Sequence, residues 1–215
     1  MIKHFFFSLL IISIVACQHL QAADQLLVAV KTDKGSFVIE LYPDKAPITV
    51  QNFLSYVDNK FYDDTIFHRI VPGVVVQGGG MGEDYRDKRT NRPIKNESDN
   101  GLLNKYKTVA MARFSNPDSA TSQFFINLKN NEGFDSTKTT PGYAVFGRIV
   151  AGMEVVEKIS RVPLGAYRAF PEAPNEAIRI LSATRTNSTA VDNNATVQKP
   201  SPFKDSLAPI NEANQ

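Results

Sequence analysis

The chain has 215 residues, of which 42% are hydrophobic and 21% are charged. This balance is typical of a soluble globular protein, and it excludes a chain that is largely disordered or largely embedded in a membrane. The formal net charge is only +2. Nothing in the charge balance therefore indicates a nucleic-acid-binding surface, and we expect no nucleic-acid partner.

The first 22 residues predict a secretory signal peptide. Lys3 precedes an apolar run at 5–16, and small and polar residues then lead to a cleavage point after Ala22. This order is the usual one for such a leader. The apolar run is too short to span a bilayer, which takes about 20 apolar residues. We therefore expect an exported, periplasmic protein.

A lipoprotein signal at 1–16 is the alternative leader. The letters IVAC, which end at Cys17, resemble the lipobox at which bacterial lipoproteins are cut and acylated. Both leaders predict export, and the second adds a lipid anchor on Cys17. Because Cys17 is the only cysteine, cleavage after Ala22 would leave a mature chain with neither a disulfide nor a thiol nucleophile.

The region after the leader predicts many short strands and only two helices. Apolar, β-branched runs at 26–30 and 37–41 flank a polar turn, which indicates a β-hairpin. A helix capped by Thr49 follows, and a second helix is expected at 153–159. Further strands are expected at 65–70, 73–77, 108–113, 123–128, 143–150 and 177–184.

This succession predicts a mainly β domain over residues 24–185. Strands and helices do not alternate regularly, which argues against a doubly wound sheet and for an antiparallel barrel or sandwich. Residues 83–104 form a long charged loop, and loops of that length are usually functional or mobile. From 186 to 215 the chain has few large apolar residues, so we expect a disordered polar tail there.

The stretch FHRIVPGVVVQGGG at 67–80 places a cation and an amide among β-branched residues. Successive side chains of a strand face opposite sides. One face of this strand pair is therefore expected to carry Phe67, Arg69, Val71, Val75 and Gln77. This pattern predicts an arginine beside a glutamine over an apolar floor, and the alternative is an arginine that only lies on an exposed face.

A second stretch, SATSQFFIN, contains the adjacent aromatic residues Phe124 and Phe125. Because neighbours in a strand face opposite ways, one ring should enter the core and the other should point outward. An exposed aromatic ring usually indicates a binding surface. The alternative is that loops cover both rings.

These stretches belong to a longer series of motifs that resembles a known family. The motifs are FHRIVPG with QGGG, PIKNE with NGL, MAR, SATSQFFIN, GYAVFGRIV and GMEVVEKI, in family order over residues 26–184. The chain is similar to the cyclophilin peptidyl-prolyl cis/trans isomerases, and most similar to their exported bacterial branch. The resemblance implies a closed, antiparallel eight-stranded barrel with two flanking α-helices.

The resemblance also implies an activity, a partner class and a set of site residues. The expected activity is rotation about Xaa-Pro peptide bonds, which would assist the folding of exported proteins. The expected partners are proline-containing unfolded or flexible polypeptides, and we expect a monomer. By family position, Arg69 and Gln77 are the catalytic residues. The substrate-binding residues are His68, Val74, Val75, Ala112, Arg113, Gln123, Phe125, Phe134 and Tyr143.

The chain departs from the family pattern at three places. Val74 stands where the family usually has phenylalanine, Gly133 stands in a position where many members have a larger side chain, and Tyr143 stands where histidine is frequent. The first two departures predict a shallower proline pocket and an isomerase of below-typical efficiency. We do not expect tight binding of cyclosporin.

The chemistry of amide rotation requires no metal, cofactor or nucleophile. Rotation is opposed by a barrier of about 18–20 kcal/mol, because the C–N bond has partial double character. A guanidinium stays protonated and can donate to the nitrogen lone pair that develops in the twisted amide. Arg69 is therefore suited to the task, with an apolar pocket that fixes the proline ring.

Other chemistries fit the sequence poorly. Outside the leader region the only histidine is His68, which leaves a metal site or a Ser-His-Asp triad without further histidines, and no G-x-S-x-G is present. Two binding functions stay open as alternatives to catalysis. One is a prolyl-peptide-binding chaperone with little turnover, and the other is a barrel that encloses a small ligand.

Overall fold

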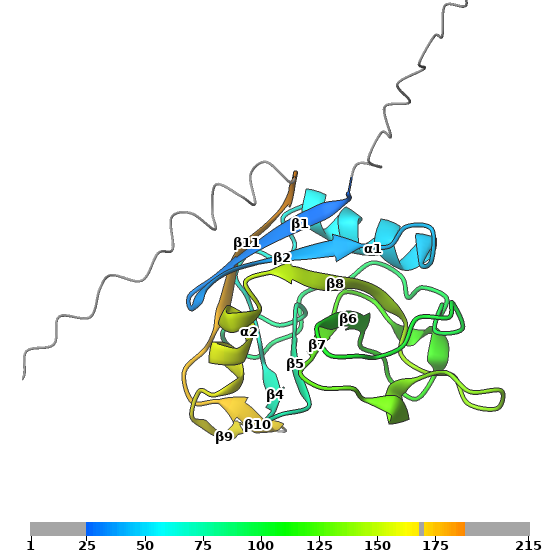
Figure 1. Ribbon diagram of the computed structural model, residues 1–215. Coiled ribbons are helices and arrows are strands. Elements are labelled where there is room, and N and C mark those ends of the chain that lie inside the picture. Colours follow the sequence, from blue (N-terminus) through cyan, green and yellow to red (C-terminus); the bar gives the residue numbers. More distant parts are fainter. Residues whose placement is uncertain (1–24, 168–169, 188–215) are drawn as a thin grey trace, which may run out of the picture.

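The structure is a computed structural model that describes residues 25–167 and 170–187 (Figure 1). The predicted leader, with its cleavage point after Ala22 and the candidate acylation site at Cys17, lies outside the described residues. So does the predicted tail, apart from its first two residues. Within the described ranges, no helix has the length and apolar character needed to cross a membrane.

Nine strands form one antiparallel sheet in the order β3-β11-β1-β2-β8-β6-β7-β5-β4 (Figure 1). The pairing of Leu27 with Thr186 brings the first and last strands side by side. The bounds are β1 (Leu27–Thr32), β2 (Gly35–Leu41), β3 (Thr65–Ile66), β4 (Arg69–Val71), β5 (Val75–Gly78), β6 (Thr108–Met111), β7 (Phe124–Asn127), β8 (Val145–Ala151) and β11 (Arg179–Thr186).

The sheet is an open half-barrel, so the expectation of a closed eight-stranded barrel is wrong. The strand expected at 65–70 is interrupted at Phe67 and His68. Its first part, β3, pairs with β11, whereas its second part, β4, pairs with β5. The two parts therefore stand at opposite ends of the ladder, and no hydrogen-bonded pairing joins them. Each of the other expected strand ranges overlaps one strand, and the mainly β class is confirmed.

A second, two-stranded sheet was not expected from the sequence. It consists of β9 (Leu164–Tyr167) and β10 (Phe170–Pro174), and β10 lies against β4 (Figure 1). Proline is disfavoured in strands because it cannot donate a ladder hydrogen bond, and β10 contains Pro171 and Pro174. This composition explains why the pattern gave no strand signal here.

The core lies between the concave face of the sheet and the helix α1 (Pro47–Asp58), while α2 (Met153–Ser160) packs against β2 and β5. The Phe53 ring lies 5.2 Å from that of Tyr62, 5.1 Å from that of Phe146 and 5.7 Å from that of Phe124. All four side chains are almost completely buried. Large side chains thus fill the interior, which argues against a barrel that encloses a small ligand.

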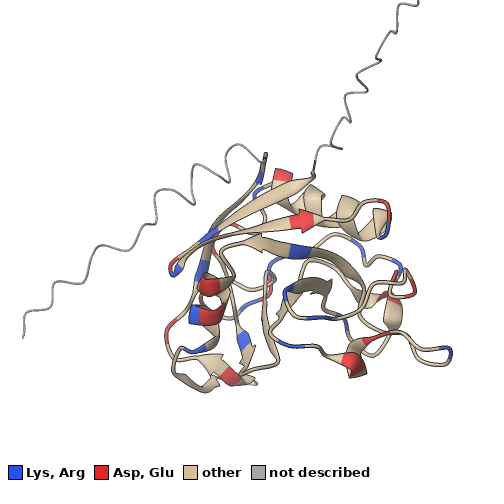
Figure 2. Ribbon diagram, viewed as in Figure 1, with Lys and Arg blue, Asp and Glu red and all other residues tan. Residues whose placement is uncertain are grey.

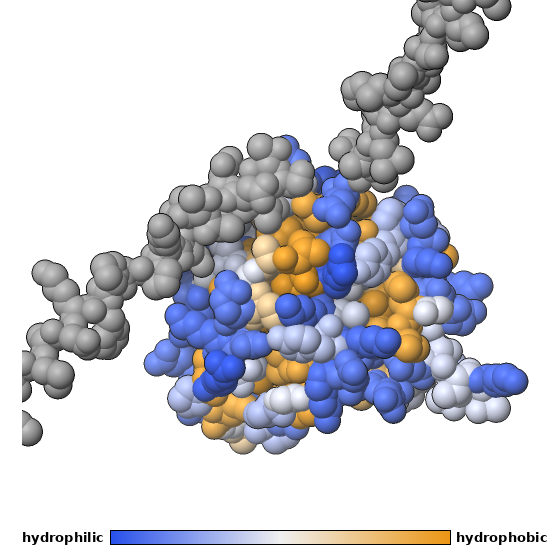
Figure 3. All heavy atoms as spheres, in the orientation of Figure 1, coloured by the Kyte–Doolittle hydropathy of each residue, from blue (hydrophilic) through white to orange (hydrophobic). Residues whose placement is uncertain are grey.

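Charged residues of both signs are interspersed along the ribbon (Figure 2). Some of them pair between distant segments, as Arg148 does with Glu40 at 2.8 Å and Arg185 with Asp58 at 2.7 Å. Apolar side chains on the same face form patches separated by hydrophilic ones (Figure 3). The small net charge therefore reflects local neutralisation and not an uncharged surface.

The N-terminus of α1 is capped by a residue from the long loop at 83–104. The helix begins at Pro47, and the expectation that Thr49 caps it is wrong because Thr49 lies inside the first turn. The Glu97 carboxylate instead accepts hydrogen bonds from the Ile48 amide at 3.1 Å, the Thr49 amide at 2.8 Å and the Thr49 hydroxyl at 2.7 Å. A carboxylate satisfies the free N–H groups there and complements the helix dipole.

We expect Glu97→Ala to lower the free energy of unfolding by about 1–2 kcal/mol, as the loss of a helix cap does elsewhere. Glu97→Gln should lose less, because its amide oxygen can still accept one of the bonds. Urea unfolding measures both, and Asp99→Ala, an exposed carboxylate of the same loop, is the control. An unchanged unfolding free energy for Glu97→Ala would show that the cap contributes nothing.

Candidate active site

The β4–β5 pair brings a cation and an amide together on the outer face of the sheet. In the antiparallel register Arg69 stands opposite Gln77, and Val71 stands opposite Val75. The Arg69 Nη1–H donates to Gln77 Oε1 at 3.3 Å, and Gln77 Nε2–H donates to Gln123 Oε1 at 3.0 Å. The alternation argument therefore places Arg69 and Gln77 correctly.

Phe67 does not share this face, contrary to expectation. Its side chain is completely buried in the core, where its ring lies 6.4 Å from that of Phe37 and edge-on to that of Phe124 at 6.2 Å. The interruption between β3 and β4 changes the alternation, so residues before and after it cannot be assigned to faces by counting.

The Gln123 side chain fills the space beside Gly80, the last of the three glycines that follow Gln77. A Cβ added to Gly80 would come within 2.4 Å of the Gln123 Cγ. Glycine at this position therefore leaves the space that the Gln123 side chain fills. Gly80 therefore serves the polar row Arg69-Gln77-Gln123, whereas Gly78 and Gly79 leave room for the core residues Phe67 and Phe124.

An apolar cluster adjoins this polar row on the same face of the sheet. Its buried members are Val75, Ala110, Phe125 and Val145, and its partly buried members are Val71, Val74, Leu102, Ala112, Phe134 and Tyr143. This cluster is separate from the main core. The sheet thus presents three polar side chains beside an apolar floor.

Phe124 and Phe125 face opposite sides of β7, as expected. Phe124 enters the main core, whereas Phe125 joins the outer cluster. Phe125 is nevertheless only 4% exposed, because the rings of Phe134 and Tyr143 pack edge-on to it at 5.7 and 5.4 Å. The expectation of an openly exposed ring is therefore wrong, and three aromatic rings form the floor together.

Gly133 lies in open space beside this floor. Gly133 is exposed, and a Cβ added there would meet no atom within 4 Å. The neighbouring Phe134 ring is part of the floor, and the effect of Gly133 on the pocket stays a prediction. Hydrogen bonds from Asn104 Nδ2 to the Phe134 carbonyl, at 3.1 Å, and from Asn131 Nδ2 to the Val74 carbonyl, at 3.1 Å, fix this part of the backbone.

The Arg113 side chain supports the rim of the cluster. Its N–H groups donate to the carbonyls of Gly142 at 3.1 Å, Phe114 at 2.9 Å and Pro141 at 2.7 Å, and its guanidinium carbon lies 4.7 Å from the Tyr143 ring centroid. The expected role of Arg113 as a substrate contact stays a prediction. Its guanidinium is engaged by backbone and steadies Tyr143.

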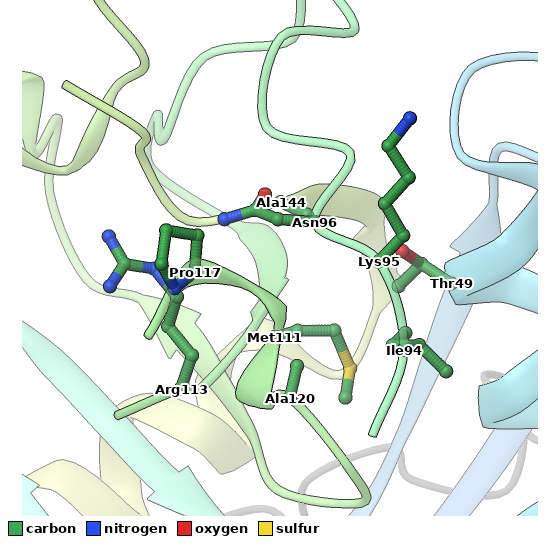
Figure 4. A pocket seen from close by; sticks show the side chains of 9 residues that line it. All are labelled: Thr49, Ile94, Lys95, Asn96, Met111, Arg113, Pro117, Ala120 and Ala144. Atoms are coloured by element: carbon green, nitrogen blue, oxygen red, sulfur yellow. The ribbon is translucent and has the colours of Figure 1, made fainter. Parts of the chain in front are cut away.

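A small pocket adjoins this rim (Figure 4). Arg113 and Pro117 lie at one side of it, and Thr49 and Lys95 lie at the other. The remaining lining residues are Ile94, Asn96, Met111, Ala120 and Ala144. The long loop at 83–104, which Glu97 anchors to α1, therefore forms one wall of a pocket beside the candidate site.

His68 directly precedes β4 and is buried, which argues against a direct contact with substrate. Its side chain is only 1% exposed, and its ring lies edge-on to that of Phe170 at 5.4 Å. Burial, together with the positive charge of Arg69, lowers the pKa of His68 from 6.5 to about 4. The ring is therefore neutral at physiological pH.

Glu172 is a site residue that the sequence reasoning missed. Its Oε2 forms an ion pair with Arg69 Nε at 2.9 Å. Glu172 belongs to β10, which the sequence pattern did not reveal, and its only sequence signal is an isolated acidic residue between prolines.

The described residues also contain no group of three or more His, Cys, Asp and Glu side chains that could hold a metal ion.

We expect stability to fall as the pH drops from about 6.5 to about 4. In this window the unfolded chain binds a proton at His68 that the folded chain does not, so acid favours unfolding. The full effect is about 3 kcal/mol at most, given the pKa of about 4 in the folded state.

Urea unfolding measured against pH tests this expectation, with His68→Gln as the variant that should lose the slope within this window. Because this substitution also changes packing, the comparison is between slopes and not between absolute stabilities. Equal slopes for the two proteins would contradict a low pKa of His68.

Comparisons with known proteins add to this geometry. The family model described as cyclophilin type peptidyl-prolyl cis-trans isomerase/CLD matches residues 27–185. A peptidyl-prolyl cis-trans isomerase of Acinetobacter baylyi is 51% identical over 156 residues, which are 73% of this chain and 83% of that protein. Peptidyl-prolyl cis-trans isomerase B of Escherichia coli is 44% identical over 161 residues, which are 74% of this chain and 98% of that protein.

A solved structure shows the same fold. It is a cyclophilin type isomerase of Cryptosporidium parvum, crystallised in the presence of the dipeptide Ala-Pro. It matches with a TM-score of 0.64 and 24% identity, and the match covers 75% of this chain and 99% of the other. At this level of identity the likeness shows the fold alone.

Proposed function

Because the chain belongs to the cyclophilin type peptidyl-prolyl cis-trans isomerases, we propose that its outer sheet face accelerates rotation about Xaa-Pro peptide bonds. The observation that carries this proposal is Arg69 beside Gln77 next to the apolar cluster around Phe125. We take residues 24–185 as the isomerase domain, and proline-containing unfolded or flexible polypeptides as its substrates.

Arg69 has donors to spare for a substrate. One N–H of Nη1 donates to Gln77, and Nε forms an ion pair with the Glu172 carboxylate. The Nη2 group and the other N–H of Nη1 have no partner among the described residues. These groups can hold the carbonyl before proline and donate to the nitrogen as it becomes pyramidal, which favours the twisted amide over both planar isomers.

Gln77 and Gln123 give this arginine a polar neighbourhood. Gln77 accepts from Arg69 and donates to Gln123, so the chain of hydrogen bonds has a fixed direction. A row of amides that is already hydrogen-bonded needs little rearrangement when the substrate charge distribution changes. Such preorganisation lowers the barrier without any covalent chemistry.

The apolar cluster serves to hold the proline ring. Phe125 and Val75 form a buried floor, with Phe134 and Tyr143 partly exposed above it. Burying apolar surface gains about 25 cal/mol per Å², so contact over some tens of Å² gives about 1 kcal/mol. An isomerase must hold the proline ring still while the residue before it rotates about the Xaa-Pro bond. A surface that only binds apolar groups does not meet this requirement.

We expect Arg69→Ala to lower kcat/KM by about a hundredfold, as the loss of one preorganised donor does in other active sites. Arg69→Lys should restore little, because an ammonium lacks the planar fork that reaches two acceptors. Rates are measured on an Xaa-Pro peptide in a protease-coupled assay, and Arg148→Ala, a similarly paired arginine on another strand, is the control.

A folded Arg69→Ala protein with the wild-type rate would refute this role of Arg69. A wild type that binds prolyl peptides but does not speed their isomerisation would support the alternative of a peptide-binding chaperone. Equal peptide affinity of wild type and variant, with unequal rates, separates binding from catalysis.

We also propose that the protein is exported to the periplasm and assists the folding of exported proteins there. Support comes from the leader, with its basic start, short apolar run and two alternative processing points at Ala22 and Cys17. Processing at Cys17 would add a lipid anchor. One acyl chain alone binds a membrane only weakly, so stable anchoring takes further lipid signals.

The leader is expected to be absent from the mature protein. Intact mass of the protein from its native host should correspond to a start at Ala23, or to a start at Cys17 with added lipid. In the second case Cys17→Ser blocks processing, and in the first it has no effect. A protein that retains Met1 and fractionates with the cytoplasm would contradict export.

A further inference from the structure

The Arg69 guanidinium is held at two separate edges. Glu172 Oε2 binds its Nε edge at 2.9 Å, and Gln77 Oε1 accepts from Nη1 at 3.3 Å. Contact with Gln77 alone is long and leaves the planar group free to turn about that bond. The shorter ion pair with Glu172 adds an electrostatic anchor at Nε, so the guanidinium is held at two of its nitrogens and not at one.

Glu172 is itself held rigidly by the small sheet that lies against β4. Phe170, two residues earlier, packs its ring against His68 at 5.4 Å and against Tyr85 at 5.8 Å. Ala173, one residue later, is buried in a cluster with Ile66 and Tyr85. The Glu172 backbone is therefore pinned on both sides, against residues that directly precede Arg69.

The β9–β10 pairing also explains why the carboxylate can reach Arg69. Phe170 pairs with Tyr167 and Ala173 pairs with Gly165, with an irregular register between the two pairs. Pro171 and Glu172 lie in this irregular part. Irregularities of this kind re-aim side chains near active sites. The prolines at 171 and 174 further limit the backbone freedom of the segment.

We propose that Glu172 is a positioning residue, which orients the Arg69 guanidinium for the substrate without touching the substrate itself. This inference rests on the proposed role of Arg69 in isomerisation. The pair is too exposed to matter much for stability, because the side chains are 40% and 36% exposed and such ion pairs contribute little. Its consequence is the orientation of a side chain that otherwise has many rotamers.

A negative charge beside Arg69 has two opposite effects on the reaction. It orients the guanidinium, which favours catalysis, and it offsets part of the positive charge that stabilises the twisted amide, which opposes catalysis. Two variants separate these effects. Glu172→Ala removes both the side chain and the charge, whereas Glu172→Gln removes the charge and keeps a polar side chain of the same size beside Arg69 Nε.

If positioning dominates, Glu172→Ala lowers kcat by about three- to tenfold and leaves KM within about twofold, because the apolar cluster that binds proline is untouched. Glu172→Gln then keeps at least about half of the wild-type kcat. Asp58→Ala is the matched control, since it breaks a similarly exposed ion pair, with Arg185, away from the site. Equal or higher kcat in Glu172→Ala overturns the proposal.

A second readout follows Arg69 without using activity. Nitrogen-15 NMR relaxation of the Arg69 Nε–H signal, identified by its loss in Arg69→Lys, measures how ordered the side chain is. The Nε–H should be more ordered in the wild type and in Glu172→Gln than in Glu172→Ala. An Nε–H signal that is identical in wild type and Glu172→Ala would also overturn the proposal.

The two proposals fail in different ways. If Arg69→Ala retains full activity, the proposed role of Arg69 is wrong, while the NMR comparison still reports whether Glu172 orients the guanidinium. If Arg69→Ala is inactive and Glu172→Ala is as fast as the wild type, only the role of Glu172 is wrong.

Discussion

The candidate site depends on the antiparallel register of β4 with β5. That register places Arg69 opposite Gln77 and Val71 opposite Val75, so one face of a single hairpin carries both a cation and part of the apolar floor. The next pairing, of Gln77 with Phe125, attaches the aromatic floor to the same row. A shift by one residue would send Arg69 into the core. Ile70 and Val76, both completely buried, oppose such a shift.

Much of the fold and part of the site could be predicted from local patterns. Alternation within β4, β5 and β7 was sufficient to put Arg69 with Gln77 and to separate Phe124 from Phe125. The pattern failed at Phe67, because a break in a strand resets the alternation and leaves no mark in composition. It also failed at β10, where the prolines conceal a strand that is held by contacts with β4.

The roles of individual side chains were harder to predict than their positions. Arg113 and His68 both lie next to site residues in the chain, yet the guanidinium of one is bonded to backbone carbonyls and the ring of the other is buried against Phe170. Sequence proximity does not reveal which hydrogen-bond partners a side chain finds. Glu97 and Glu172 illustrate the converse, since each acts on a segment far from it in the chain.

The pairing of β1 with β11 has a consequence for the order in which the chain can fold. Until residues near the C-terminal end of the domain are available, β1 has β2 as its one neighbour and its other edge is unpaired. Contacts between residues so far apart in sequence make folding slow, because a long loop must close before they form. A chain of this topology therefore stays incompletely folded until its last strand has been delivered, whichever compartment delivers it.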